Sequence, residues 1–369
     1  MQDNDNRTVL TLDAGGTNFV FSAIRGNEEV VEPFHMPAYP DDLQKCLDSL
    51  IFGFQQVMKK IDDRPVAISF AFPGPADYEN GIIGDLPNFP AFRGGVALGP
   101  LLKEKFGLPV FINNDGNLFA YGEALAGVLP EINAELEKAG SHKQYKNLLG
   151  VTLGTGFGGG VVINNVLLTG DNGCGGDVWC SVNMYNSDLI SEEGVSIRAV
   201  KRVYKELSGE NRELTPKDIY DIAEGEKEGN RQAAMNAFEE LGRVAGFTIA
   251  ESLNIVDGIV VLGGGISKAY KYILPAMLTE MRGTRSMISG SIFPRLQMKV
   301  YNLMNDIEKK TFLKDESRLI QVPGSDKKIS YSTKKKTGVI VSKVGASMAI
   351  ALGAYHYALN QLDRKLVNK

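Results

Sequence analysis

The sequence is poor in cysteine and histidine, with three of each among its 369 residues. So few cysteines exclude a disulfide framework. No apolar run approaches the roughly 20 residues that a membrane span needs. The polar start, MQDNDNRTVL, does not have the pattern of a secretory signal peptide. We therefore expect a cytoplasmic protein that does not associate with a membrane.

Excess charge of one sign is also missing. The net charge of -4 gives no electrostatic reason to expect a nucleic-acid partner. The chain contains no G-x-x-x-x-G-K-[ST] segment, which excludes a P-loop enzyme. Its 43% hydrophobic and 23% charged residues are ordinary for a globular protein, and its length suffices for two domains with well-filled cores.

Glycine, by contrast, is plentiful and gathers at the ends of predicted strands. VLTLDAGGTNFVFSAIR (9–25) predicts two strands joined by a glycine-rich turn, with a third strand over 29–34 after a turn at 25–27. The same order of strand, glycine turn, strand, turn and strand returns in LLGVTLGTGFGGGVVINNVLLTG (148–170), about 140 residues later. A repeat on this scale indicates a duplicated domain.

Helices alternate with short strands along the rest of the chain. Residues 41–61 have apolar side chains at helical spacing, and strands are predicted over 66–72, 109–115 and 258–265. Further helices are expected near 191–207, 217–225 and 230–253, from residue 267, and at the small-residue segment GASMAIALGAYHYAL near the end. The lysine-rich stretch 305–340 has no clear pattern, and STKKKTG within it is expected to be a solvated loop. This alternation predicts an α/β protein with mixed sheets.

A strand that ends in glycines can bring backbone N–H groups close to phosphate oxygens. Asp13 would repel a bare phosphate at the first turn, but Mg²⁺ and its waters can bridge a carboxylate to phosphate oxygens. The second turn, GTGFGG, matches the dinucleotide-binding spacing; yet a strand follows it, whereas that fold requires a helix. A third turn, LGGGIS (262–267), is either a plain strand-to-helix turn capped by Ser267 or a bare surface for a nucleoside.

The motifs LDAGGTN, PGPADYENGIIGDLPNFPAF, NNDGN, LGVTLGTGFGGGVVINN and VVLGGGIS stand in the order of the ROK family of bacterial sugar kinases and repressors, which the chain resembles over about residues 8–300 and the last helix. The resemblance implies two ribonuclease H-like domains of the actin and hexokinase type with a cleft between them. Their expected bounds are 1–114 plus 346–369 for the smaller domain and 115–345 for the larger.

The resemblance also implies roles for individual residues. It makes Asp115 the catalytic base, with the N-terminus of the following helix expected to keep its carboxyl ionised; an ordinary N-cap is the alternative reading of this aspartate. The residues expected to bind Mg-ATP are Asp13, through the metal, with Gly15, Gly16 and Thr17, then Thr155, Gly156 and Gly158, then Gly264 and Gly265. The residues expected to bind the sugar are Asn88, Asn114, Asp115, Asp177 and Glu193.

One segment departs from the family pattern. ROK kinases carry Glu-x-Gly-His and then a zinc-binding cysteine cluster, but here Asp177 stands in place of the glutamate and Cys180 in place of the histidine. Cys174 and Cys180 are too few to close a tetrahedral site, so we predict no structural zinc. The match of Glu193 to the glutamate that follows the cluster depends on a shortened loop.

The leading hypothesis is an ATP- and Mg²⁺-dependent kinase that phosphorylates a hexose or a hexose derivative, and the resemblance implies a homodimer. A sugar-responsive repressor is a second hypothesis; we expect no helix-turn-helix, because the first glycine turn begins at residue 13. A sugar-binding member without catalytic activity is a third, suggested by the changes at residues 177 and 180.

Overall fold

A computed structural model describes residues 5–74, 76–85 and 89–367. The chain forms two compact units, each described by itself below. The first unit contains residues 1–127, 160–176 and 344–369, and the second contains 128–159 and 177–343. The chain therefore passes between the units several times.

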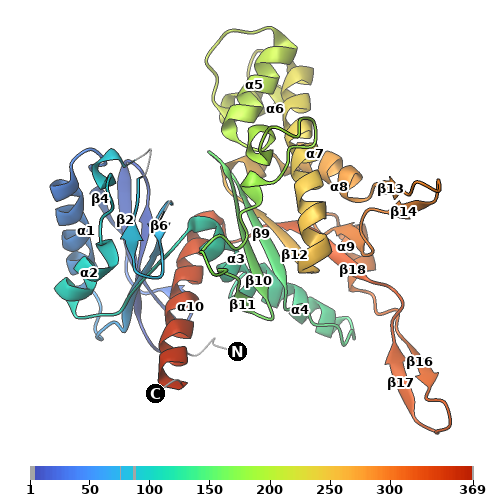
Figure 1. Cartoon of the computed structure of the whole chain (residues 1–369), viewed down its shortest axis with the longest axis horizontal. Coiled ribbons are helices and arrows are strands. Elements are labelled where there is room, and N and C mark those ends of the chain that lie inside the picture. The colour runs from blue at the N-terminus through green and yellow to red at the C-terminus, as the bar shows by residue number, and fades with distance from the viewer. Residues whose placement is uncertain (1–4, 75, 86–88, 368–369) are drawn as a thin grey trace. The chain divides into compact units, whose positions relative to one another are not determined.

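The elements alternate along the chain (Figure 1). The α-helices are α1 (Leu43–Met58), α2 (Leu98–Phe106), α3 (Asp115–Leu125), α4 (Val128–Lys138), α5 (Ile197–Ser208), α6 (Pro216–Glu224), α7 (Arg231–Val256), α8 (Tyr270–Met281), α9 (Asp306–Leu313) and α10 (Ala346–Val367). The short 3-10 helices are η1 (Pro90–Phe92), η2 (Val178–Cys180), η3 (Ser191–Gly194) and η4 (Gly265–Ala269). The strands are β1 (Val9–Ala14), β2 (Asn18–Arg25), β3 (Glu28–Glu29), β4 (Phe34–Pro37), β5 (Ala67–Ala71), β6 (Ala76–Asp77), β7 (Ile82–Ile83), β8 (Val110–Asn113), β9 (Leu148–Leu153), β10 (Phe157–Ile163), β11 (Val166–Leu167), β12 (Ile259–Gly263), β13 (Thr284–Ser286), β14 (Ile292–Pro294), β15 (Lys299–Asn302), β16 (Arg318–Gln321), β17 (Lys328–Tyr331) and β18 (Lys336–Val341).

The sheet of the first unit has the order β3-β2-β1-β5-β8, with β4 paired to β2. β1 and β2 are antiparallel, whereas β1, β5 and β8 run parallel. α1 contacts β2 and β4, and α10 contacts β1, β5 and β8. Helices of this kind on a mixed sheet form the α/β architecture that the sequence predicts.

The α1 helix shows how sequence pattern becomes packing. Asp42 accepts a hydrogen bond from the backbone N–H of Lys45 and caps the helix. Helical spacing then brings Cys46, Leu50 and Phe54 to one buried face, so the prediction of an amphipathic helix is confirmed. Cys46 is a core residue, and its burial raises the pKa of the thiol to about 12.

The predicted third strand over 29–34 is wrong. The turn before it forms as expected, with Gly26 and Asn27 both at positive φ. β3, however, is only two residues long, and the chain then bends so that β4 pairs with β2 from Asn18↔Pro37 to Phe21↔Phe34. β3 and β4 therefore pair with the two ends of the same edge of β2, and the residues between them leave the sheet.

The second sheet has the order β11-β10-β9-β12-β18-β15. β9, β12, β18 and β15 run parallel, whereas β10 and β11 form the hairpin that repeats the N-terminal pattern. Asn164 and Asn165, at positive φ, occupy its turn. α7 packs on α8, where Gly246 leaves room for the backbone of Met277. The second sheet thus repeats the strand pattern of the first.

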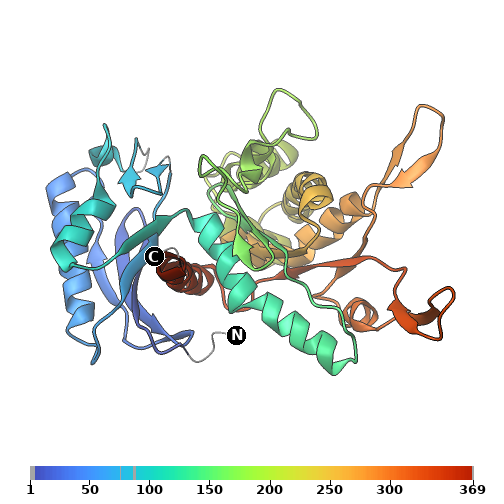
Figure 2. The same cartoon turned by 60° about the horizontal axis from the view of Figure 1, so that its bottom comes forward.

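The segment 305–340, which has no clear sequence pattern, folds as α9, the β16–β17 hairpin and β18. Residues 332–335 lie exposed in a loop as expected. Lys336 does not: it begins β18, and its ammonium group donates to the carbonyls of Thr311, Phe312 and Lys314 near the end of α9. Figures 1 and 2 show that the hairpins β13–β14 and β16–β17 project from the body of the second unit.

The last helix packs closely, as its small residues predict. An added Cβ at Gly353 would collide with the carbonyl of Leu118, and one at Gly122 would collide with the carbonyl of Ala349. α10 therefore lies against α3, and the two helices join the end of the chain to the first unit. Among the described residues, no helix combines the length and apolar character required to traverse a bilayer.

Candidate functional site

The first glycine turn lies at the tip of the β1–β2 hairpin. The strands pair from Val9↔Ile24 to Ala14↔Phe19, so Asp13 is the second-last residue of β1 and the turn begins just after Ala14. Gly15 sits tightly, because an added Cβ would lie 2.9 Å from the carbonyl oxygen of Asn18. Gly16, by contrast, has no neighbouring atom within 4 Å of such a Cβ, and Asp13, Gly16 and Thr17 are exposed. The tip therefore presents open backbone beside a carboxylate.

Asp115 lies at the same edge of the first sheet as Asp13. β1, β5 and β8 are parallel, so their carboxyl ends share one edge, and Asp115 follows the end of β8. The N-cap of α3 is Asn114, whose side-chain oxygen accepts a hydrogen bond from the backbone N–H of Asn117 at 2.6 Å. Asp115 is thus the first helical residue, which rules out its reading as the N-cap.

The electrostatic setting of Asp115 differs from the prediction. The side chain is exposed to solvent, yet the protein packed around it raises the pKa of its carboxyl through desolvation. The backbone N–H of Gly116, which donates to the carboxyl at 2.9 Å, acts in the opposite direction, while the nearby charge of Asp13 raises the pKa further. Desolvation therefore outweighs the helix N-terminus that was expected to keep the group ionised.

The second glycine turn, at the tip of β9–β10, is braced by a carboxylate that the sequence analysis missed. Glu192 accepts a hydrogen bond from the backbone N–H of Phe157 at 3.0 Å. Arg198 pairs with Glu192 at 3.1 Å and with Glu193 at 2.8 Å. A Cβ at Gly156 would collide with the Glu192 carboxylate. The only signal for this contact is the Glu-Glu pair, which does not tell the two residues apart.

The third turn lies next to the second. β12 is parallel to β9, with Gly263 opposite Thr152, so both turns follow the carboxyl ends of adjacent strands. Gly264 has φ +84°, and an added Cβ would collide with the carbonyl of Leu153. Ser267 does not cap an α-helix; its hydroxyl donates to the carbonyl of Gly264 at 2.7 Å within η4.

Three glycines hold the N-terminus of α3 against the segment 160–176. A Cβ at Gly160 would collide with the carbonyl of Gly116 and lie 2.8 Å from the Cα of Asn117. Gly176, at φ +91°, packs in turn on Gly160, with 3.0 Å between its added Cβ and the Cα of Gly160. We call Gly116, Gly160 and Gly176 the glycine stack. The close packing of the stack restricts the position of Gly116, the residue that follows Asp115.

Asp177 follows the glycine stack in the chain and precedes η2. Its carboxyl is half-buried; desolvation raises its pKa, and a hydrogen bond from the side chain of Trp179 opposes that rise. Cys180 is exposed, and its thiol donates to the carbonyl of Asp177 at 3.3 Å. Within the described ranges, no group of three His, Cys, Asp or Glu side chains has the arrangement of a metal site.

The remaining predicted sugar ligands are placed less fully. Asn88 lies outside the described residues. Glu193 lines a hollow of about 510 Å³ in the second unit, together with Tyr185, Arg202 and Glu240. Its carboxylate pairs with Arg198, whereas the carboxylate of the neighbouring Glu192 accepts from Phe157 at the second tip.

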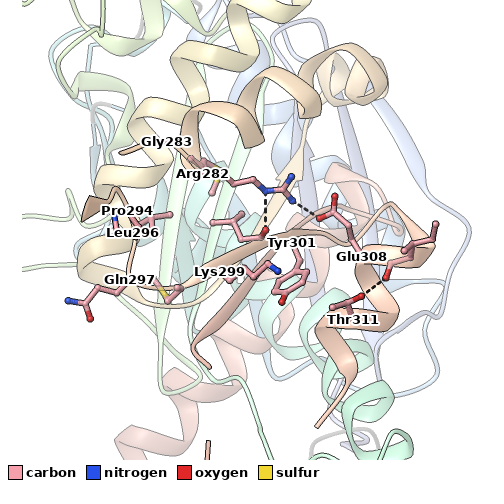
Figure 3. A pocket seen from close by; sticks show the side chains of 13 residues that line it. Arg282, Gly283, Pro294, Leu296, Gln297, Lys299, Tyr301, Glu308 and Thr311 are labelled. Atoms are coloured by element: carbon pink, nitrogen blue, oxygen red, sulfur yellow. Dashed lines mark hydrogen bonds and ion pairs between the residues drawn. The ribbon is translucent and has the colours of Figure 1, made fainter. Parts of the chain in front are cut away.

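Another hollow contains no predicted site residue. It has a volume of about 610 Å³ and lies between α8, β15 and α9 (Figure 3). Its lining is mainly apolar, and two of its charged groups are paired: Arg282 donates to the carbonyl of Val300 at 3.1 Å and forms an ion pair with Glu308. The ammonium group of Lys299 lies 5.2 Å from the centroid of the Tyr301 ring.

The predicted residues thus gather in two sets. The first unit holds Asp13, Gly15, Gly16 and Thr17 with Asn114 and Asp115 at one sheet edge. The second unit holds Thr155, Gly156 and Gly158 beside Gly264 and Gly265, with Asp177 and Glu193 on other segments of the same unit. Each unit therefore has a glycine tip at the end of a parallel strand, and the acidic base candidate belongs to the first.

Comparison with known proteins identifies this arrangement. A family model described as "ROK family" matches residues 9–287. The chain belongs to the ROK family. It is 57% identical to a glucokinase of Parabacteroides distasonis, whose crystal structure has a TM-score of 0.89 to this chain, with 98% of this chain and 99% of that one covered.

The family also includes repressors and more distant kinases. A xylose repressor of Caldicellulosiruptor bescii is 27% identical over 85% of this chain and 77% of its own length. A ROK glucokinase of Streptomyces griseus, solved in complex with glucose and AMPPNP, shares the fold with a TM-score of 0.60 at 17% identity, covering 94% of this chain and 98% of that one. These matches confirm the predicted resemblance and fold class.

Proposed function

We propose that this sugar kinase of the ROK family transfers the γ-phosphoryl group of ATP to a hydroxyl of glucose, with Asp115 as the general base. The observation that supports the proposal best is the position of Asp115: a solvent-accessible carboxyl at the edge where β1 and β8 end, beside the exposed glycine tip and Asp13. Similarity to a glucokinase along almost the whole chain favours glucose over other hexoses.

We assign the phosphates of ATP to the two glycine tips. Gly16 is open to solvent and a Cβ there would have no neighbour, so its backbone N–H is accessible to a phosphate oxygen. At the second tip, the contact from Phe157 to Glu192 fixes the backbone beside Gly156. Gly264 and Gly265, which follow the adjacent strand, would lie against the nucleoside.

The proposed Mg²⁺ site is formed by the oxygen donors at the first glycine tip. Asp13 is an exposed carboxylate next to open backbone, and Mg²⁺ prefers such an oxygen donor, usually with several waters retained. The bound ion would neutralise charge on the triphosphate. Asp13 would hold it through its carboxylate oxygens, and the other residues of the tip would orient the phosphates.

We assign Asp115 as the group that accepts the proton of the sugar hydroxyl. As the sugar oxygen forms its bond to phosphorus, the hydroxyl proton passes to a carboxylate oxygen of Asp115. A raised pKa makes that carboxylate a better proton acceptor than an ordinary aspartate. The glycine stack fixes the start of α3 and hence the position of the base.

We assign contacts with the sugar hydroxyls to Asp177 and Asn114. Asn88 and Glu193 are further predicted sugar ligands. The side-chain oxygen of Asn114 is already engaged by its cap hydrogen bond, so its amide group would donate to the sugar. The domain bounds 1–114 plus 346–369 and 115–345, closure of the two domains over the substrates, and a homodimer all remain predictions.

The test is an ADP-release assay over a sugar panel with wild type and Asp115→Asn. We expect glucose to be the best acceptor and the variant to lose about 10²- to 10⁴-fold in kcat. Calorimetry should show that Asp115→Asn still binds glucose, which separates loss of the base from loss of the site. Asp62→Asn, which removes an exposed carboxylate elsewhere in the first unit, is the matched control and should retain full activity. Comparable turnover by the Asp115 variant would reject the assignment.

A repressor function is the second candidate, because ROK relatives include a xylose repressor. Binding of duplex DNA at physiological salt without sugar phosphorylation would favour it.

A further inference from the structure

The chain contains one tryptophan, Trp179, and its position beside Asp177 has no role in the function proposed so far. It lies in η2, a single turn of 3-10 helix whose neighbouring residue Val178 is buried. Trp179 itself is 40% exposed. The turn therefore uses Val178 as its anchor and leaves the largest side chain in the sequence at the surface.

The indole N–H of Trp179 faces a residue of the candidate sugar site. It lies close enough to the carboxyl of Asp177, the residue to which we assign the sugar hydroxyls, to lower the pKa of that carboxyl against the rise that desolvation causes. One edge of the ring thus lies beside the candidate ligand, and the exposed part of its apolar surface is accessible to another contact. An aromatic face next to a few polar groups is a usual composition for a small-molecule site.

The turn is also held in place on its C-terminal side. Ser181 accepts a hydrogen bond from the backbone N–H of Ser191 at 2.7 Å, and Val182 pairs with Ile190 in an isolated bridge. These contacts join η2 to η3, the segment that carries Glu192 to the second glycine tip. Trp179 thus stands on a segment braced against the candidate site rather than on an unsupported loop.

We propose that Trp179 is a sugar-binding residue, whose indole face packs against the C–H face of the hexose ring while its N–H holds Asp177 in position for the hydroxyls. The C–H bonds of a pyranose carry partial positive charge, which the negative face of an indole attracts. This inference rests on the proposed function, and it adds an apolar contact with the ring to the hydroxyl contacts of the sugar site. A hexopyranose with an unobstructed C–H face is the ligand class it selects.

Because no other tryptophan exists, intrinsic fluorescence reports on this ring alone. In wild-type protein without ATP, glucose should shift the emission to shorter wavelength and saturate at the Kd that calorimetry gives. Asp115→Asn should keep this response although it is inactive. A saturating calorimetric signal with unchanged emission would overturn the proposal for Trp179 and leave the kinase function intact.

Kinetics supplies the second test. Trp179→Ala should raise the KM for glucose about five- to tenfold, as expected for loss of one aromatic contact, with kcat and the KM for ATP within twofold. Trp179→Phe keeps a ring and should recover most of that loss. Phe293→Ala, which removes an exposed aromatic on the β13–β14 hairpin, is the control and should behave as wild type. A glucose KM within twofold of wild type for Trp179→Ala would reject the contact. Absence of both sugar binding and phosphorylation in the wild type would overturn the proposed function together with this inference.

Discussion

Gly160→Ala tests whether steric control of α3 sets the rate of the proposed reaction. A Cβ at this position would lie 2.8 Å from both the Cα of Asn117 and the Cβ of Ala120, and would collide with the carbonyl of Gly116. Carbon atoms in ordinary contact are about 3.5–4.0 Å apart, so the start of α3 has to move by roughly 1 Å. Asp115, one residue before Gly116, moves with it.

The expected effects on rate and stability can be separated. A displacement of about 1 Å at a reacting group costs on the order of 10²-fold in rate, so kcat should fall by about that factor. Overpacking should also cost about 1–3 kcal/mol of unfolding free energy. The assay is ADP release under saturating glucose and ATP, with a denaturant titration on the same preparation.

Gly246→Ala is the matched control, because its added Cβ would meet the carbonyl oxygen of Met277 at 2.6 Å in the α7–α8 packing of the second unit. It should lose similar stability and keep its kcat. A Gly160→Ala variant that loses the expected stability but retains kcat within twofold would refute the link between the glycine stack and the position of Asp115.

Three further predictions concern the charged groups of the two tips. Since Asp115 must be ionised to accept a proton and its pKa is raised, activity should fall with decreasing pH at a higher pH than an ordinary aspartate would impose. In the folded state the ionised form is disfavoured, so Asp115→Asn should raise Tm at neutral pH. That advantage should shrink as pH falls below the raised pKa and vanish below the pKa of an ordinary aspartate. Glu192→Ala removes the acceptor for the N–H of Phe157 and should reduce kcat/KM for ATP about tenfold, whereas Glu192→Gln, which keeps an acceptor, should lose less; equal loss in both would show that the charge matters and not the hydrogen bond. Removal of Mg²⁺ with EDTA should abolish activity, and Asp13→Asn should require more Mg²⁺ for half-maximal rate, so an unchanged Mg²⁺ titration would contradict the role of Asp13.

Much of the fold follows from local pattern. The repeated strand and glycine turn predicted both hairpins, and the apolar spacing over 41–61 predicted α1 with its buried face, because these features depend on residues close in sequence. β4 was missed because it has only four residues and its pairing with β2 is decided by tertiary contact. β18 was missed because it begins inside the lysine-rich segment, which has the composition of a loop. Only the fold shows that the ammonium group of Lys336 is largely enclosed and donates to three carbonyls.

The candidate site was predictable where chemistry has a sequence signature. Asp13 and Asp115 follow apolar strands, and such positions at parallel strand ends come together at one sheet edge. Glu192 could not be distinguished from Glu193, since only the fold shows which carboxylate turns toward Phe157. The raised pKa of Asp115 could not be predicted from the sequence either, because it depends on how much protein surrounds the carboxyl and on the proximity of Asp13.

The most direct test of the account is a crystal structure of the chain with glucose, Mg²⁺ and a non-hydrolysable ATP analogue. The account predicts analogue phosphates held by backbone N–H groups of residues 15–17 and 155–156, with an oxygen of Asp115 about 2.6–3.2 Å from one glucose hydroxyl in line with the γ-phosphorus. Phosphates bound away from both glycine tips, or a glucose hydroxyl beyond the reach of Asp115, would contradict it.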